Sequence, residues 1–319
     1  MEHYVTLFDS LFLPQGMALQ LSMERHAGEY TLWILCMDDE VHGVLDKLSL
    51  PNVRLMQLST LETPELKLVK PARSKGEYCW TLTPWAPRFV FEADPAVERV
   101  TYLDADVWFR KSPNPIFKEF GDSGKHVLIT DHAHAPEHDQ SATSGQYCVQ
   151  FMTFTREGGE VVRRWWQERC MEWCYARHED GKFGDQKYLD DWPLRFPDQV
   201  HVLQNKEWML APWNATRFPY SHSIIWHFHS VRIFARSNVV CGIVCGNYQL
   251  PDVVRKYIYQ RYLADLSLCA DQLTDAKVRI VSQINYSTTA RLKGWLLGLQ
   301  NGMWRVNKNR FMANRRKIK

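Results

Sequence analysis

The sequence predicts an α/β fold with a mostly parallel central sheet, on three observations. Strand-like and helix-like segments alternate from residue 4 to residue 58, which is typical of parallel strands joined by right-handed crossovers. Residues 30–37, YTLWILCM, form a nearly unbroken apolar run, as expected for a strand covered on both faces. Acidic residues directly follow several of the predicted strands, among them 30–37 and 98–103, where α/β sheets usually bind their ligands.

The N-terminal part supplies the alternation element by element. Residues 4–8 are short, β-branched and aromatic, and predict a strand. Residues 14–26 have helical apolar spacing with a proline near the start. The apolar run 30–37 is the second strand, Asp38 and Asp39 open a second helix, and residues 53–58 form a third strand.

The rest of the chain continues the pattern. Apolar spacing predicts helices at residues 78–91, 159–177 and 184–189, and a mainly helical segment from residue 251. Apolar, β-branched runs predict further strands at residues 98–103, 126–130, 149–155 and 223–228. We therefore expect one large domain over residues 1–250 and a helical C-terminal extension over residues 251–319.

Composition and charge exclude several classes of protein. A hydrophobic fraction of 45% indicates a folded chain. The net charge is +3, yet residues 304–319 carry seven Lys and Arg and no acid, so the remainder is net acidic. This distribution argues against a nucleic-acid partner. The eight cysteines lack zinc-site spacing, and no signal peptide or membrane span is predicted, so we expect a cytoplasmic protein.

The most informative motif is the pair Asp104 and Asp106, which directly follows the strand at residues 98–103. Two carboxylates so close together repel each other unless a cation lies between them. A hard divalent ion, Mn²⁺ or Mg²⁺, takes carboxylate and phosphate oxygens together. This ion would bind Asp106 and Asp104 on one side and a diphosphate on the other. It would neutralise the charge that develops as the diphosphate leaves. The alternative is a solvated turn, against which the aromatic neighbours argue.

Two histidines supply a third candidate ligand. His227 and His229 lie two apart in an apolar strand, and so on one face of it. Imidazole is a good Mn²⁺ ligand. We expect His227 to complete the site with the two aspartates, while His229 could instead bind phosphate or acceptor. Buried core histidines are the alternative interpretation.

Asp185 and Gln186 form a second candidate catalytic segment, within GDQKYLD at residues 184–190. They lie at the start of a predicted helix, where the free backbone N–H groups and the helix dipole favour negative charge. Asp185 is either an N-cap or, with Gln186, a contact of a sugar ring at a developing oxocarbenium-like centre, by analogy with glycosidases.

These three motifs, in this order, resemble bacterial GT-A glycosyltransferases near family 8, the glycogenin-like and lipooligosaccharide galactosyltransferase-like enzymes. LDADV at 103–107 is similar to the family's metal-binding segment, DQKYLD at 185–190 to its DQxxLN segment, and HFHS at 227–230 to its HFxG segment. The resemblance covers residues 1–235. It implies a GT-A fold, a UDP-sugar donor and retention of anomeric configuration.

The sequence departs from the family at two places. The family follows HFxG with KPW, whereas this chain continues Val231-Arg232-Ile233-Phe234, so that Arg232, one position out of register, would neutralise phosphate. Asp190 stands where the family has asparagine. The stretch 205–214 also resembles polysaccharide-assembly proteins.

The resemblance also locates the nucleotide. It implies that the base and ribose bind at the first strand and its loop, through Thr6, Phe8 and Asp9, with Asp39 as a further candidate. Ordinary loop chemistry after a strand is the alternative. The catalytic base stays open between Asp131, Asp185 and Asp191.

The C-terminal segment 290–319 combines leucines and tryptophans with the basic tail. This pattern is typical of a helix that lies on an anionic membrane surface, or of a packed helix followed by a basic end. The first interpretation predicts peripheral attachment to the inner face of the plasma membrane and a lipid-linked acceptor, as in lipopolysaccharide or capsule synthesis.

We therefore expect a glycosyltransferase that moves a sugar from a nucleotide-diphosphate sugar to a glycan or lipid-linked acceptor. A nucleotidyltransferase that makes such donors is one alternative, but residues 6–10 contain no Gly-rich basic phosphate loop. An inactive scaffold that binds sugar or lipid is another, because 13 Trp and 13 Tyr could stack on carbohydrate.

Overall fold

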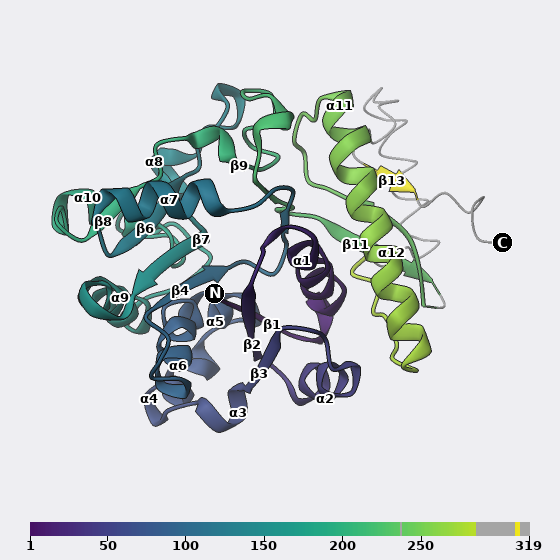
Figure 1. Cartoon of the computed structure of the whole chain (residues 1–319), viewed down its shortest axis with the longest axis horizontal. Coiled ribbons are helices and arrows are strands. Elements are labelled where there is room, and N and C mark those ends of the chain that lie inside the picture. Colours follow the sequence, from purple (N-terminus) through teal and green to yellow (C-terminus); the bar gives the residue numbers. More distant parts are fainter. Residues whose placement is uncertain (237, 285–309, 313–319) are drawn as a thin grey trace.

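A computed structural model describes residues 1–236 and 238–284, together with the backbone of residues 310–312. A seven-stranded sheet in the order β3-β2-β1-β4-β7-β6-β8 forms the centre of the molecule (Figure 1). Its strands are β1 (Glu2–Phe8), β2 (Tyr30–Cys36), β3 (Val53–Gln57), β4 (Arg99–Leu103), β6 (Val127–Asp131), β7 (Tyr147–Thr155) and β8 (Val200–Val202). Only β7 is antiparallel to its neighbours in this sheet. The predicted α/β class with a mostly parallel sheet is confirmed.

Helices cover both faces of the sheet. The described α-helices are α1 (Leu13–His26), α2 (Asp39–Leu48), α3 (Leu58–Leu61), α4 (Pro64–Val69), α5 (Lys75–Leu82), α6 (Trp85–Ala93), α7 (Asn114–Ser123), α8 (Ser141–Ser144), α9 (Arg156–Glu172), α10 (Trp192–Arg195), α11 (Asp252–Val254) and α12 (Gln260–Asp275). One core contains side chains of α1, α2, α7 and α12, and the other contains side chains of α4, α5, α6 and α9. Alternate residues of β1 enter opposite cores, Tyr4 the first and Val5 the second, as the two-residue period of a strand requires.

Two predicted helices differ from the observed ones. The segment predicted as one helix at residues 78–91 forms α5 and α6, which are separated at Thr83 and Pro84; proline has no N–H to continue the helical ladder. The segment 184–189 begins with a turn, and only Lys187–Asp191 form a short 3-10 helix.

Two small sheets complete the fold. β5 (Val107–Phe109), β10 (Ile225–His227) and β9 (Met209–Leu210) form one, in the order β5-β10-β9. β11 (Arg232–Arg236), β12 (Val239–Val244) and β13 (Arg310–Met312) form the other, with antiparallel pairs. The first of these sheets carries part of the candidate site.

The C-terminal helix α12 packs against the body of the protein. Asp265 is buried, forms an ion pair with Arg25 of α1, and accepts a hydrogen bond of 2.8 Å from Trp108 Nε1 of β5. The first core therefore contains side chains from both sides of residue 250, and the proposed boundary there stays a prediction. The segment 290–319 lies outside the described residues except for the backbone of 310–312. No helix in the described part of the chain has both the length and the apolar character needed to cross a bilayer.

Candidate active site

The carboxyl ends of six parallel strands meet at one edge of the central sheet. β1, β2, β3, β4, β6 and β8 run in the same direction, and an aspartate lies at the end of four of them or within two residues after it. Asp9, Asp38, Asp104 and Asp131 mark this edge after or at the ends of β1, β2, β4 and β6. In open α/β sheets this is the edge where ligands bind.

The pairing of β5 with β10 brings His227 to the two aspartates. The chain turns after β4 through Asp104 and Asp106 into β5, and β10 pairs with β5 so that His227 lies opposite Val107. The next backbone N–H, of Phe228, donates to the carbonyl of Asp106 over 2.8 Å. A histidine more than a hundred positions away in sequence therefore lies beside the pair.

The three side chains form a compact cluster. One ligand atom from each of Asp104, Asp106 and His227 lies within 4.8 Å of the other two. His227 Nε2 is 3.0 Å from Asp106 Oδ1 and 3.7 Å from Asp104 Oδ2. Tyr102 donates to the other oxygen of Asp104 over 3.1 Å. Two carboxylates and an imidazole are ligands that suit Mn²⁺ or a similar divalent ion.

The pKa values of the three side chains indicate that a positive charge beside the two carboxylates stabilises their ionised forms. Burial raises the pKa of Asp104 to about 6, and the charge of Asp106 adds to this effect. Burial also acts to raise the pKa of Asp106, but the attraction of His227 outweighs it and lowers that pKa below its ordinary value. In the protein without metal, a protonated His227 can supply the missing charge, since burial disfavours its cation but Asp106 raises its pKa well above 6.5. The donor set therefore fits a divalent cation.

Asp185 and Gln186 lie in the turn that precedes the 3-10 helix. Asp185 is 2% exposed, and its Oδ2 has no hydrogen-bond partner among the described residues. Burial and then the charge of Asp104 raise its pKa to about 7. Gln186 donates from Nε2 to the carbonyl of Ser144 over 2.7 Å, and it, not Asp185, precedes the 3-10 helix. The N-cap interpretation of Asp185 is therefore wrong, because the helix begins one residue later, at Lys187.

Gly184 permits this turn. Its φ of +54° lies in the left-handed region, and a Cβ there would lie 3.2 Å from the ring of Trp80. Both constraints favour glycine. The backbone carbonyl of Asp185 accepts a hydrogen bond of 2.8 Å from the buried Trp166 Nε1, which holds the turn against α9.

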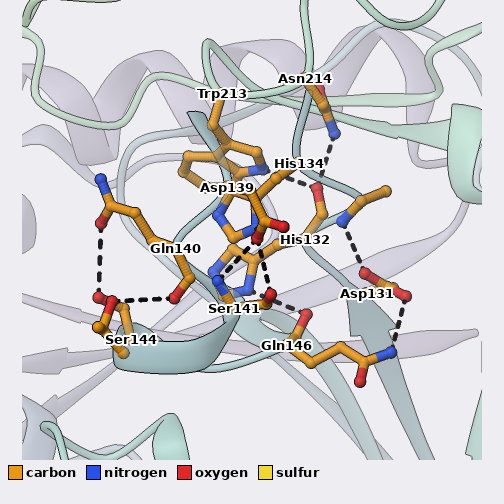
Figure 2. A network of polar contacts seen from close by, with 12 residues as sticks. Asp131, His132, His134, Asp139, Gln140, Ser141, Ser144, Gln146, Trp213 and Asn214 are labelled. Carbon is orange, nitrogen blue, oxygen red and sulfur yellow. Dashed lines mark hydrogen bonds and ion pairs between the residues drawn. The ribbon is translucent and has the colours of Figure 1, made fainter. Parts of the chain in front are cut away.

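A network of rings and hydrogen bonds surrounds the loop after β6 (Figure 2). The rings of His132 and His134 stack with centroids 4.7 Å apart, and Trp213 contacts both. Trp213 also packs against His227 and His229, with centroids at 5.2 and 5.4 Å. This tryptophan therefore lies between the loop after β6 and the histidines of the cluster.

Hydrogen bonds hold the network in place. Trp213 Nε1 and Asn214 Nδ2 both donate to the carbonyl of His132, over 2.8 and 3.0 Å. His132 Nδ1 lies 3.1 Å from the carbonyl of Gln146, which can only accept, so Nδ1 carries the proton and Nε2 carries the lone pair. Burial lowers the pKa of His132 to about 3, so its imidazole is neutral at pH 7.

Thr6, Phe8 and Asp9, predicted to bind nucleotide, belong to β1 and its loop, next to β4 in the sheet. Thr6 and Phe8 are buried within β1, so a nucleotide would reach their backbone rather than their side chains. Asp9 accepts hydrogen bonds from the N–H groups of Leu11 and Phe12.

Asp39 and Arg232 contact side chains outside the metal cluster. Asp39 is exposed and accepts from Gln57 Nε2 over 2.8 Å. Arg232 is exposed at the start of β11, with its guanidinium near the ring of Phe12. Their roles stay predictions, as do those of Thr6, Phe8 and Asp9.

Sequence reasoning missed the ring network apart from naming Asp131 and the stretch that contains Trp213. A signal was present, since His132 and His134 follow β6 as Asp104 and Asp106 follow β4. The spacing of two after a strand end was therefore a second example of the pattern that identified the aspartates.

Comparisons with known proteins agree with this fold. The chain is 31% identical over 254 residues to "Uncharacterized protein YfnF" of Bacillus subtilis (strain 168), covering 74% of this chain and 84% of that protein. "Uncharacterized protein YfnD" of the same organism is 26% identical over 291 residues, covering 86% and 91% of the two chains. No family model matches the chain.

Among solved structures, the galactosyltransferase LgtC in complex with donor and acceptor sugar analogues superposes with a TM-score of 0.51 at 13% identity, covering 83% of this chain and 95% of that one. This likeness shows the GT-A fold that the resemblance to family 8 implied. By its identity and coverage with YfnF, the chain belongs to the same family as YfnF, and it has a GT-A fold that resembles that of family 8 glycosyltransferases.

Proposed function

We propose that the protein is a glycosyltransferase that moves a sugar from a nucleotide-diphosphate sugar, with UDP as the nucleotide, to a glycan or lipid-linked acceptor in bacterial cell-surface polysaccharide synthesis. The observation that carries the proposal is the convergence of Asp104, Asp106 and His227 at the ligand-binding edge of a GT-A sheet. Nothing in a purely structural role requires two half-buried acids and a buried imidazole to meet there.

The residues of the cluster have separate tasks. Asp104, Asp106 and His227 would hold Mn²⁺ or Mg²⁺, and Tyr102 orients Asp104. When bound, the cation supplies positive charge to the diphosphate that leaves. Arg232 would add charge from β11.

Sugar and acceptor lie on the side of β7 and β6. Asp185 and Gln186 would hold the donor sugar, because Asp185 presents a buried oxygen without a partner in the described part of the chain. On the acceptor side, the neutral His132 keeps Nε2 as a hydrogen-bond acceptor for a hydroxyl group. Retention of anomeric configuration comes from the resemblance to family 8, and NMR of the product anomer tests it.

The decisive experiment is Mn²⁺-dependent hydrolysis of a panel of nucleotide sugars. We expect the wild type to release nucleoside diphosphate from one of them and to be stabilised thermally by that nucleotide with Mn²⁺. Asp106→Asn should reduce metal-dependent hydrolysis at least a hundredfold with little change in the melting temperature of the free protein.

Asp122→Asn is the matched control. Asp122 is exposed on α7 and pairs with Lys118, so the same chemical change there should leave hydrolysis intact. Normal turnover by Asp106→Asn would contradict the metal role, and no stabilisation by any nucleoside diphosphate would favour an inactive scaffold.

Membrane attachment through residues 290–319 is a separate proposal, and this segment lies outside the described side chains. A chain that ends at residue 289 should lose association with anionic liposomes and keep donor hydrolysis. Equal liposome binding by both forms would contradict it.

A further inference from the structure

An open cavity lies at the same edge of the sheet, beyond the ring network. It has a volume of about 620 Å³, within the usual range of ligand sites. Its lining residues are Glu119, Gln204, Asn205, Lys206, Glu207, Trp208, Arg217 and Phe218. Most of them follow β8, which runs parallel to β6, so the cavity lies at the carboxyl end of the last strand of the sheet.

The chemistry of the lining suits carbohydrate. Trp208 and Phe218 are half-buried and offer aromatic faces, on which the apolar faces of sugars pack. Gln204, Asn205 and Arg217 are exposed and offer planar hydrogen-bonding groups.

The charges of the lining cancel. Lys206 pairs with Asp131 over 2.6 Å, Glu207 with His222, and Glu119 with His201 over 2.8 Å. Two acids and two bases line the cavity, so it has no net charge to attract an anion. A neutral ligand fits this balance better than a phosphate or an acidic sugar.

The walls of the cavity are connected directly to the proposed active site. Lys206 Nζ contacts Asp131, and Arg217 Nη1 donates to the carbonyl of His134 over 2.9 Å. Asp131 is the last residue of β6 and His134 belongs to the loop that follows, whose His132 ring contacts Trp213. A chain of contacts through this loop and Trp213 therefore joins the cavity to His227 of the metal cluster.

The strand order separates this cavity from the nucleotide. The predicted nucleotide residues belong to β1 and the start of α2, the cluster follows β4, and the cavity follows β8 at the opposite end of the sheet. A ligand in the cavity would approach the cluster from the side away from the nucleotide.

We propose that this cavity binds the outer sugars of a neutral oligosaccharide acceptor, whose reacting end lies at the ring network. The inference rests on the proposed function and specifies its acceptor as an oligosaccharide chain, not a single sugar. Trp208 and Phe218 stack on the sugars, and Arg217, Gln204 and Asn205 bind their hydroxyl groups.

The test is binding of the full chain, without donor or metal, to an array of neutral and acidic glycans. We expect binding to at least one neutral oligosaccharide of three or more sugars, weaker by tenfold or more for the matching monosaccharide. Trp208→Ala should lose at least tenfold in affinity, while Trp165→Ala, a half-buried tryptophan on α9, should bind as the wild type does.

Arg217→Ala and Gln204→Ala test the same site without disturbing the core, because both side chains are exposed. Each variant should bind the same glycan more weakly at an unchanged melting temperature, even if Trp208→Ala misfolds. No glycan binding, binding to acidic glycans alone, or equal binding by Trp208→Ala, Arg217→Ala and the wild type would overturn the proposal. Donor hydrolysis by the wild type, measured separately, reports on the proposed function: hydrolysis without glycan binding would overturn the acceptor site alone, and glycan binding without hydrolysis would overturn the proposed function alone.

Discussion

Replacement of Asp185 by asparagine should stabilise the metal-free fold at neutral and alkaline pH. The carboxyl group is buried, one oxygen has no partner in the described part of the chain, and its pKa is raised to about 7 by burial and by Asp104. This difference from the ordinary value of 3.8 corresponds to about 4 kcal/mol, because one pKa unit is equivalent to about 1.4 kcal/mol. Asparagine keeps the shape of the protonated acid and carries no charge.

The sign follows from proton linkage. Between about pH 4 and pH 7 the folded state holds the Asp185 proton and the unfolded state has lost it, so the free energy of unfolding falls as the pH rises through this window. Below it both states are protonated, and above it the loss is complete. The variant lacks this loss, and its advantage over the wild type should grow to several kcal/mol by pH 8.

Urea unfolding at pH 4.5 and pH 8 in the presence of EDTA measures the effect. We expect a small difference between Asp185→Asn and the wild type at pH 4.5 and a large one at pH 8, together with loss of sugar transfer. Asp122→Asn, at an exposed acid, should show no such dependence. An unfolding free energy for Asp185→Asn at or below that of the wild type at pH 8 would refute the electrostatic argument.

Two further predictions concern the frame of the site. Asn214→Ala removes three hydrogen bonds of a fully buried amide, including the one to the carbonyl of His132. The free energy of unfolding, measured with urea, should fall by about 2–4 kcal/mol. A change below about 0.5 kcal/mol would contradict this prediction. Gly16→Ala places a Cβ 2.3 Å from the buried ring of Phe8 and should destabilise the fold by about 1–3 kcal/mol. Gly43→Ala, whose Cβ would meet nothing within 4 Å, should stabilise it by about 0.5–1 kcal/mol. Shifts of the melting temperature in the same direction for both variants would show that the ring of Phe8 moves aside.

The parts of the structure set by local pattern could be predicted from the sequence, and those set by distant pairing could not. Apolar runs and acids after strands identified the sheet and the edge with Asp104 and Asp106, and the motif order added His227. β5 and β9 were not predicted, because strands of three and two residues have too little periodicity to be recognised without their partners.

The ring network escaped prediction for a related reason. Its defining contact, Trp213 between His132 and His227, joins three segments that are remote in sequence. Each segment alone is consistent with an ordinary loop or core residue. The register of β10 against β5 and the hydrogen bonds of Asn214 decide that they meet, and neither is visible in one sequence.

The same contact couples the two halves of the proposed site. Trp213 touches the loop after β6 on one side and His227 on the other, and its Nε1 holds the carbonyl of His132. A shift of that loop when an acceptor binds would therefore press on a side chain of the metal cluster. Interiors are packed too closely to absorb such a shift without movement of neighbours. Trp213→Phe keeps the packing and removes the hydrogen bond, so acceptor should then enhance metal-dependent donor cleavage less than in the wild type, while cleavage without acceptor stays near the wild-type rate. Equal enhancement by acceptor in both proteins would show that the two halves act independently.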